Sequence, residues 1–285
     1  MSGVIDMSGF DFASMDIATL AKLAAALLGA GAAAGFLAGL LGVGGGIVVV
    51  PVLFHLFAAM GVAAAFAMNL AVGTSLAIII PTSISSMCAH HRHGAVDMAL
   101  LRRWGAPVFL GAVIGVAVAG LVGGAMLTVV FACGALMIAL YLGISREDTS
   151  LAGGLPGESL RPLLGGGIGC LSVMMGIGGG SLSVSMMRLA GFPIHRAVGT
   201  GAALGLVIAL PGAVGFVWAG MGTPELPPLS LGYVNLLGVT LIFPVTVCMA
   251  PVGAALAHRL EREYLQKGFA MFLAVSAILM LLRQG

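Results

Sequence analysis

The chain carries one glycine-rich motif twice, once in each half. The first copy, at residues 42–46, has the sequence GVGGG, and the second, at 176–180, has the sequence GIGGG. Glycine is about 1 kcal/mol less favourable than alanine inside a helix, so each run predicts a break between two helical arms. Broken helices at matching places in two halves of a membrane protein are typical of a binding site near the bilayer midplane.

Composition places these arms in a membrane. Apolar residues make up 60% of the chain and charged residues only 8%, whereas soluble domains carry about 25% charged residues. Residues 20–54 contain a single charged side chain, that of Lys22. Stretches of this length and hydropathy predict transmembrane helices. The expected fold is therefore an all-α polytopic membrane protein.

Further matches indicate two homologous repeats. The tripeptide VGT at 72–74 recurs at 198–200, and VD at 96–97 corresponds to VN at 234–235. We therefore predict a single integral membrane domain with four parts: an N-terminal segment (1–17), repeat 1 (18–143), a polar cytoplasmic linker (144–161) and repeat 2 (162–285).

Each repeat is expected to contain a glycine-broken helix hairpin followed by three transmembrane spans. In repeat 1 the hairpin covers about 20–60 and the spans about 68–89, 104–122 and 125–143; in repeat 2 the hairpin covers about 162–190 and the spans about 197–219, 233–256 and 266–282. The arms of the second hairpin, 162–175 and 178–190, are shorter than the roughly 20 residues needed to cross, which predicts a re-entrant hairpin. The first arm of the first hairpin is longer, and whether it crosses stays open.

The placement of basic residues predicts the orientation. Ten of the twelve Lys and Arg residues fall in four loops, at 90–103, 144–162, 188–196 and 257–267, whereas the loops at 61–67, 120–126 and 220–232 contain none. The positive-inside rule puts the basic loops in the cytoplasm, and both termini then lie in the periplasm. A hairpin that returns to its own side plus three spans makes an odd number of crossings. The two repeats should therefore be inverted relative to each other.

The longer motif GFLAGLLGVGGG at 35–46, followed by Pro51, resembles the TauE/SafE family of sulfite and organosulfur anion exporters. Its echo GCLSVMMGIGGG at 169–180 is similar, and VGTS at 72–75 looks like a second signature of that family. The resemblance covers both halves and implies a bacterial inner-membrane permease of about eight helices. Ser185 stands where the repeat would place another Pro51, and Gly201 where it would place another Ser75, so strict functional symmetry is not expected. These motifs do not identify the anion.

The expected anion site uses backbone N–H groups, because no charged side chain falls near the middle of a predicted span. The second arm of each hairpin begins at the glycines, so its first N–H groups are unpaired and its dipole end is positive. Glycine lets an anion approach this backbone closely. The alternative is that the glycines only allow close helix packing. The candidate backbone contacts are Gly42, Gly44, Gly45, Gly46, Gly178, Gly179 and Gly180.

Side chains are expected to complete the site. Hydroxyls can donate to an anion without adding charge, although in membrane helices they often bond their own backbone carbonyls. The candidate hydroxyls are those of Thr74, Ser75, Ser181 and Thr200. Asn69 and His195 hold equivalent positions at the starts of their spans and are candidates for the entrance, with helix capping as the alternative for Asn69. His55 is the one titratable residue placed inside the membrane; it is either the proton-coupling group or a neutral histidine bonded to a neighbouring helix.

These features predict a transporter that exports a small anion, sulfite or an organosulfonate. The alternative is a passive anion channel for the same substrates. No enzyme is expected, since the spans show no nucleophile with a base, no cofactor motif and no metal-ligating cluster. The expected partners are the anion and the lipid bilayer, with no nucleic acid, and a homodimer is compatible with the sequence.

Overall fold

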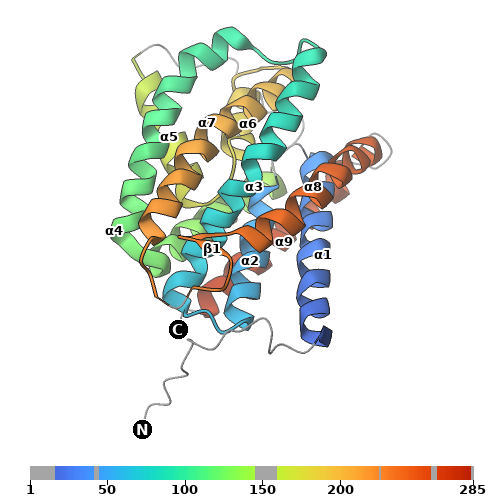
Figure 1. Ribbon diagram of the computed structural model, residues 1–285. Coiled ribbons are helices and arrows are strands. Elements are labelled where there is room, and N and C mark those ends of the chain that lie inside the picture. Colours follow the sequence, from blue (N-terminus) through green and yellow to red (C-terminus); the bar gives the residue numbers. More distant parts are fainter. Residues whose placement is uncertain (1–16, 42–44, 145–158, 225, 258–261, 284–285) are drawn as a thin grey trace.

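The computed structural model describes residues 17–41, 45–144, 159–224, 226–257 and 262–283. Nine helices and two short strands make up most of this part of the chain (Figure 1). The helices are α1 (Ile17–Leu41), α2 (Gly46–Ala59), α3 (Ala64–Arg92), α4 (Met98–Ile144), α5 (Arg161–Met174), α6 (Gly180–Leu189), α7 (Ile194–Gly220), α8 (Leu236–Ala257) and α9 (Arg262–Leu282), and the strands are β1 (Ser230–Leu231) and β2 (Val234–Asn235). A helix satisfies its own backbone hydrogen bonds, which is what an apolar chain in lipid requires.

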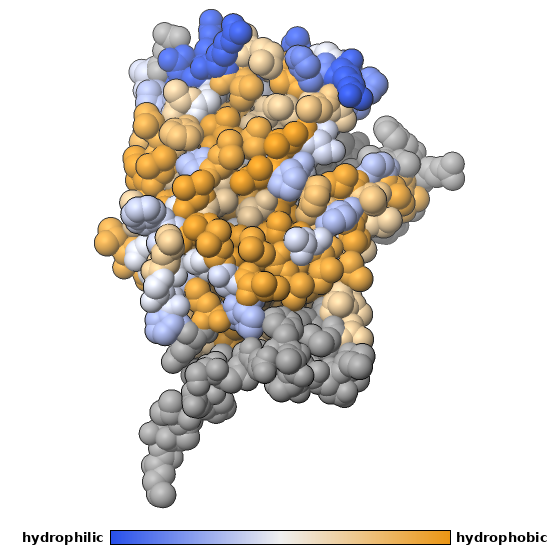
Figure 2. All heavy atoms as spheres, viewed as in Figure 1, coloured by the Kyte–Doolittle hydropathy of each residue, from blue (hydrophilic) through white to orange (hydrophobic). Residues whose placement is uncertain are grey.

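Four of the described helices, α3, α4, α7 and α8, are long and apolar enough to cross a membrane, judged by length and composition. Large apolar side chains are exposed on them, for example Leu121 (87%) and Trp218 (79%). Figure 2 shows a broad apolar region across the middle of one face, with hydrophilic residues gathered at its top. Soluble monomers rarely expose apolar surface on this scale. The chain is an all-α multi-pass membrane protein, as predicted.

Each predicted span has a helix in the structure, with two differences in detail. The predicted spans 104–122 and 125–143 are joined in α4, which breaks at Gly123 (φ 71°, ψ 175°), a conformation that glycine tolerates and other residues do not. The strands β1 and β2 form an antiparallel pair in the connection before α8. They were not predicted, because two-residue strands leave no periodic signal in a sequence.

The helices α3 and α7 pack against each other at the centre of the bundle and run in opposite directions (Figure 1). On the outside, α1 packs along α8, and α5 packs along α4. In the most apolar 18-residue stretch of α3, 67% of the residues are buried, whereas only 22% are buried in the corresponding stretch of α8. The centre of the bundle is therefore built around α3, while α8 is less buried and lies nearer the outside.

The two predicted repeats exchange equivalent hydrogen bonds. The Asn235 N–H donates to Thr74 Oγ1 (2.9 Å), and the Asp97 N–H donates to Thr200 Oγ1 (2.9 Å). These residues are the ones that the sequence matches between the repeats. Each threonine thus holds the backbone just before the helix that follows in the opposite repeat, α8 for Thr74 and α4 for Thr200.

The same two connections are also capped in the same way. Asp97 Oδ1 accepts the Leu100 N–H (2.9 Å), and Asn235 Oδ1 accepts the Gly238 N–H (2.8 Å). Each side chain therefore satisfies an N–H group that its helix leaves unpaired in the first turn. The two halves resemble each other in their contacts as well as in their sequence.

Candidate functional site

The second glycine motif forms the buried tip of the α5–α6 hairpin. The helix α5 ends at Met174, and α6 begins at Gly180. Between them, Gly176 adopts φ +64°, which favours glycine, and the Ile177 N–H donates to Ser172 O (3.0 Å). The whole tip is buried. Non-helical backbone is tolerated in a membrane protein where other parts of the protein cover it.

The tips of the two hairpins touch each other. A Cβ on Gly46, at the start of α2, would stand 2.7 Å from Gly176 O and 3.1 Å from Ile177 Cα. Ser75 Oγ of α3 donates to the same Gly176 O (2.8 Å). Close packing therefore explains part of the glycine pattern, and it brings the start of α2 against the turn that leads into α6.

The starts of α2 and α6 have no side-chain caps. Gly45 and Gly179 are their N-cap residues. The first N–H groups of both helices therefore lack intrahelical partners and carry the positive end of the dipole. Of the other predicted backbone contacts, Gly178 is buried in the second tip, whereas Gly42 and Gly44 lie outside the described residues.

The predicted hydroxyl side chains are buried, and some of them make hydrogen bonds that hold the fold together. Thr74 and Thr200 are both 0% exposed. The Oγ1 atom of each accepts the backbone N–H described above, from Asn235 and Asp97 respectively. The hydroxyl proton of each threonine can still donate. The Ser75 hydroxyl donates to Gly176 O, and this hydrogen bond holds the second tip against α3. Ser181 is buried in the first turn of α6. Thr74 and Thr200 thus have structural roles that the sequence did not reveal.

The other three predicted side chains, those of Asn69, His195 and His55, make their described contacts away from the hairpin tips. Asn69 is buried, faces Gly124 of α4, and its Oδ1 has no hydrogen-bond partner among the described residues. His195 is exposed at the start of α7. His55 lies roughly 13 Å along α2 from its start, where its Nδ1 is 3.5 Å from Arg283 Nη1. The entrance and coupling candidates are therefore separate from the tips.

Three residues beside the second tip were missed by the sequence analysis. Gly205 of α7 lies next to Gly179, and Ser83 of α3 lies next to Gly205. Ser183, in the first turn of α6, is 0% exposed, and its Oγ has no partner within the described chain. A signal for Ser183 was present, because α6 begins GSLSVS where the equivalent α2 begins GIVVVP.

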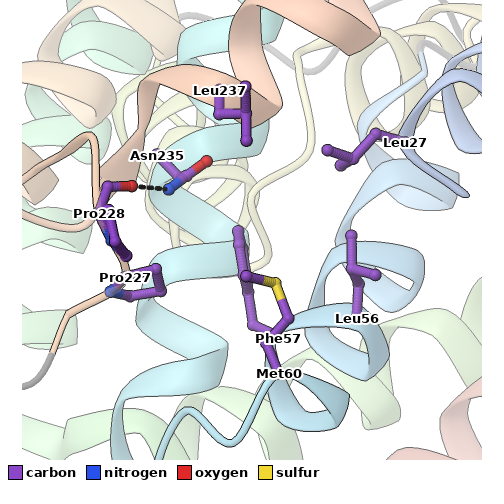
Figure 3. Close-up of a pocket in the computed structure, with 8 residues that line it drawn as sticks. All are labelled: Leu27, Leu56, Phe57, Met60, Pro227, Pro228, Asn235 and Leu237. Carbon is purple, nitrogen blue, oxygen red and sulfur yellow. Dashed lines mark hydrogen bonds between the residues drawn. The ribbon is translucent and has the colours of Figure 1, made fainter. Parts of the chain in front are cut away.

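A separate small pocket lies between α1, α2, α8 and the segment before β1 (Figure 3). Its lining is mostly apolar and consists of Leu27, Leu56, Phe57, Met60, Pro227, Pro228, Asn235 and Leu237. The amide that reaches it, Asn235 Nδ2, already donates to Pro228 O (3.2 Å) and Ser230 Oγ (3.1 Å). Because the Asn235 amide is already hydrogen-bonded and the lining is mostly apolar, this pocket is poorly suited to bind an anion. The hairpin tips are the better candidate for the anion site.

Residues 27–280 match the family model described as sulfite exporter TauE/SafE. The chain is 35% identical over 259 residues to a probable membrane transporter protein of Haemophilus influenzae, which covers 89% of this chain and 96% of that protein. It is 24% identical over 258 residues to a probable membrane transporter protein of Methanocaldococcus jannaschii (87% and 91%), and 29% identical over 256 residues to the probable membrane transporter protein YunE of Bacillus subtilis (82% and 88%). No solved structure matches the chain significantly. The family match over nearly the whole chain, the similarity to these relatives and the spanning helices show that the protein belongs to the TauE/SafE family of membrane transporters.

Proposed function

We propose that this protein exports a small anion, sulfite or an organosulfonate, across the inner membrane of a bacterium. The observation that carries the proposal is the meeting of the two hairpin tips, where Gly46 at the start of α2 contacts Gly176, in the buried turn that leads into α6. A helix N-terminus at a buried place favours negative charge. The description of the matching family, a sulfite exporter, supports the choice of anion.

The anion is bound without a positively charged side chain. The first turns of α2 and α6 contain no lysine or arginine, so the attraction comes from backbone N–H groups and the helix dipoles, assisted by the hydroxyl protons of Thr74 and Thr200. The tight contact between the tips requires them to separate when the anion enters.

The protein is oriented with its basic loops in the cytoplasm and both termini in the periplasm. The repeats are inverted, so that the connection between α3 and α4 is cytoplasmic and the connection between α7 and α8 is periplasmic. The exposed basic residues at the end of α3 and the start of α4 support this orientation, as do the opposite directions of α3 and α7 (Figure 1).

Cysteine labelling tests this topology. Arg103→Cys and Met221→Cys both place a thiol at an exposed position, and neither site is a positive-φ glycine. In a background from which the four native cysteines have been removed, a membrane-impermeant maleimide added to intact cells is expected to label position 221. Position 103 should react only after the inner membrane is opened. Labelling of both positions from the same side contradicts the inverted arrangement.

Export is driven by the membrane potential. An anion leaving a cell that is negative inside gains about 2.3 kcal/mol per charge at 100 mV, which sustains roughly a fifty-fold gradient. His55, the proton-coupling candidate, is distant from the tips and faces Arg283. In proteoliposomes with equal pH on both sides, sulfite flux is expected to follow an imposed potassium diffusion potential, and His55→Gln should leave that flux unchanged. Flux that ignores the potential, stops when a pH gradient is collapsed and is lost in His55→Gln identifies proton coupling instead.

A passive anion channel is the alternative function, because no coupling residue lies at the tips. A flux assay with a panel of anions separates the two. A transporter shows saturable uptake of radiolabelled sulfite that unlabelled anion on the opposite side accelerates, whereas a channel shows neither saturation nor acceleration. The close packing at Gly46 and Gly176 favours the transporter, since a channel needs a continuous open path.

A further inference from the structure

The starts of α2 and α6 differ in the chemistry of their first turns. The first turn of α2 continues with Ile47, Val48 and Val49, which are apolar and at most 1% exposed. The equivalent turn of α6 contains Ser181 and Ser183, which are 3% and 0% exposed. Polar groups are expensive to bury without partners. Ser183, whose Oγ has no partner among the described residues, therefore requires an explanation that the first tip does not.

A hydroxyl and a backbone N–H meet beside Gly205 of α7. The point where a Cβ on Gly205 would stand is 3.0 Å from Ser83 Oγ and 3.3 Å from the Gly179 nitrogen. Ser83 is only 8% exposed, and its hydroxyl makes no hydrogen bond with the described part of the chain. The Ser83 hydroxyl therefore lies at the start of α6, next to the N-cap residue, with its proton free to donate.

The first tip has a different residue at the equivalent position. The repeat places Ile79 of α3 at the position of Gly205, and the Ile79 Cδ1 atom lies 2.9 Å from where a Cβ on Gly46 would stand. The isoleucine side chain lies beside the start of α2, whereas the glycine in α7 places no side chain beside the start of α6 and lets the Ser83 hydroxyl approach there. Position 209, the repeat equivalent of Ser83, is an alanine.

Ser183 adds a second hydroxyl to this place. It lies one helical turn after Gly179 and so on the same side of α6, and side chains in a helix lean toward its N-terminus. Its Oγ is buried and has no partner among the described residues. A buried hydroxyl left without a partner costs about 1–3 kcal/mol, and a bound ligand that accepts its proton removes that cost.

We propose that the second hairpin alone holds the anion, with the hydroxyls of Ser83 and Ser183 donating to it together with the N–H groups at the start of α6. This inference rests on the proposed function and places the anion at the start of α6 instead of between the two tips. The expected ligand is a singly charged oxyanion, bisulfite or an organosulfonate. No lysine or arginine lies in the first turn of α6 or in α3 before Arg92, and the cost of desolvating a dianion such as sulfate is far larger.

Binding of radiolabelled methanesulfonate and of sulfite at mildly acidic pH to the purified full-length protein tests the proposal. Ser83→Ala and Ser183→Ala are each expected to weaken binding about ten-fold, the loss expected for one hydrogen bond to a charged group. Ser276→Ala removes a buried hydroxyl from α9 and should leave binding unchanged. Sulfate should compete at least about ten-fold less well than methanesulfonate.

The thermal stability of the same variants shows whether weaker binding reflects a lost contact with the anion or a damaged fold. Because the Ser83 and Ser183 hydroxyls have no partner within the described protein, alanine at either position should leave stability unchanged or raise it slightly. Weaker binding with unchanged stability supports the proposal. Wild-type affinity in both alanine variants, in a protein that binds and transports the anion, overturns the single site and leaves the proposed function standing. A wild-type protein that binds neither anion overturns both.

Discussion

Gly46→Ala is expected to abolish anion flux and to destabilise the protein by about 1–3 kcal/mol, the range for an overpacked core. The added methyl group would stand 2.7 Å from Gly176 O and 2.9 Å from Ile79 Cδ1. The isoleucine can adjust, but the carbonyl belongs to the second tip, which is held by the Ser75 hydrogen bond. The methyl group therefore forces the two tips apart, and the start of α2 loses its contact with the turn that leads into α6.

Gly29→Ala is the matched control for this change. Gly29 lies in α1, and nothing stands within 4 Å of the position that its Cβ would take. Alanine is favoured over glycine inside a helix by about 1 kcal/mol, so this variant should be as stable as the wild type or more so, with full flux. Thermal inactivation in detergent and flux in proteoliposomes measure both quantities. Equal behaviour of Gly46→Ala and Gly29→Ala would show that the tips are not in contact in the folded protein.

Thr74→Val should destabilise the protein by about 1–3 kcal/mol, because valine leaves the buried Asn235 N–H without an acceptor. Thr200→Val removes the matching acceptor of the Asp97 N–H and is expected to have a smaller effect. Asp97 is only partly buried, so water can replace part of the lost hydrogen bond. The pair of variants therefore measures the two reciprocal contacts between the repeats separately.

Thr128→Val provides the control for the threonine variants. Thr128 is also 0% exposed, but its hydroxyl donates to Gly124 O four residues earlier in the same helix (3.0 Å), a carbonyl that the helix already engages. We expect at most a small change in stability there. If Thr74→Val is no more harmful than Thr128→Val, the exchange between the repeats contributes little to the fold. Anion binding by the same variants shows whether either threonine proton also reaches the substrate.

The sequence alone was sufficient for the class of fold and for the approximate position of most helices. The scarcity of charged residues and the long apolar stretches require helices that satisfy their own backbone in lipid. The glycine runs marked the tip of the second hairpin, since several glycines together weaken a helix whatever surrounds them. The matches of VGT with VGT and of VD with VN likewise located residues that make equivalent contacts in the structure.

The partners of those residues were decided only by the tertiary structure. Thr74 and Asn235 are 161 positions apart, and no local pattern indicates that they meet, so the sequence offered only an anion or the helix's own backbone as the partner of the threonine hydroxyl. Ser83 and Gly205 come to the start of α6 only because α3 and α7 pack together at the centre of the bundle. Periodicity and propensity act over a few residues, whereas a binding site collects groups from distant segments. The helices follow from local sequence, but which hydroxyls remain free to bind an anion depends on the packing of one repeat against the other.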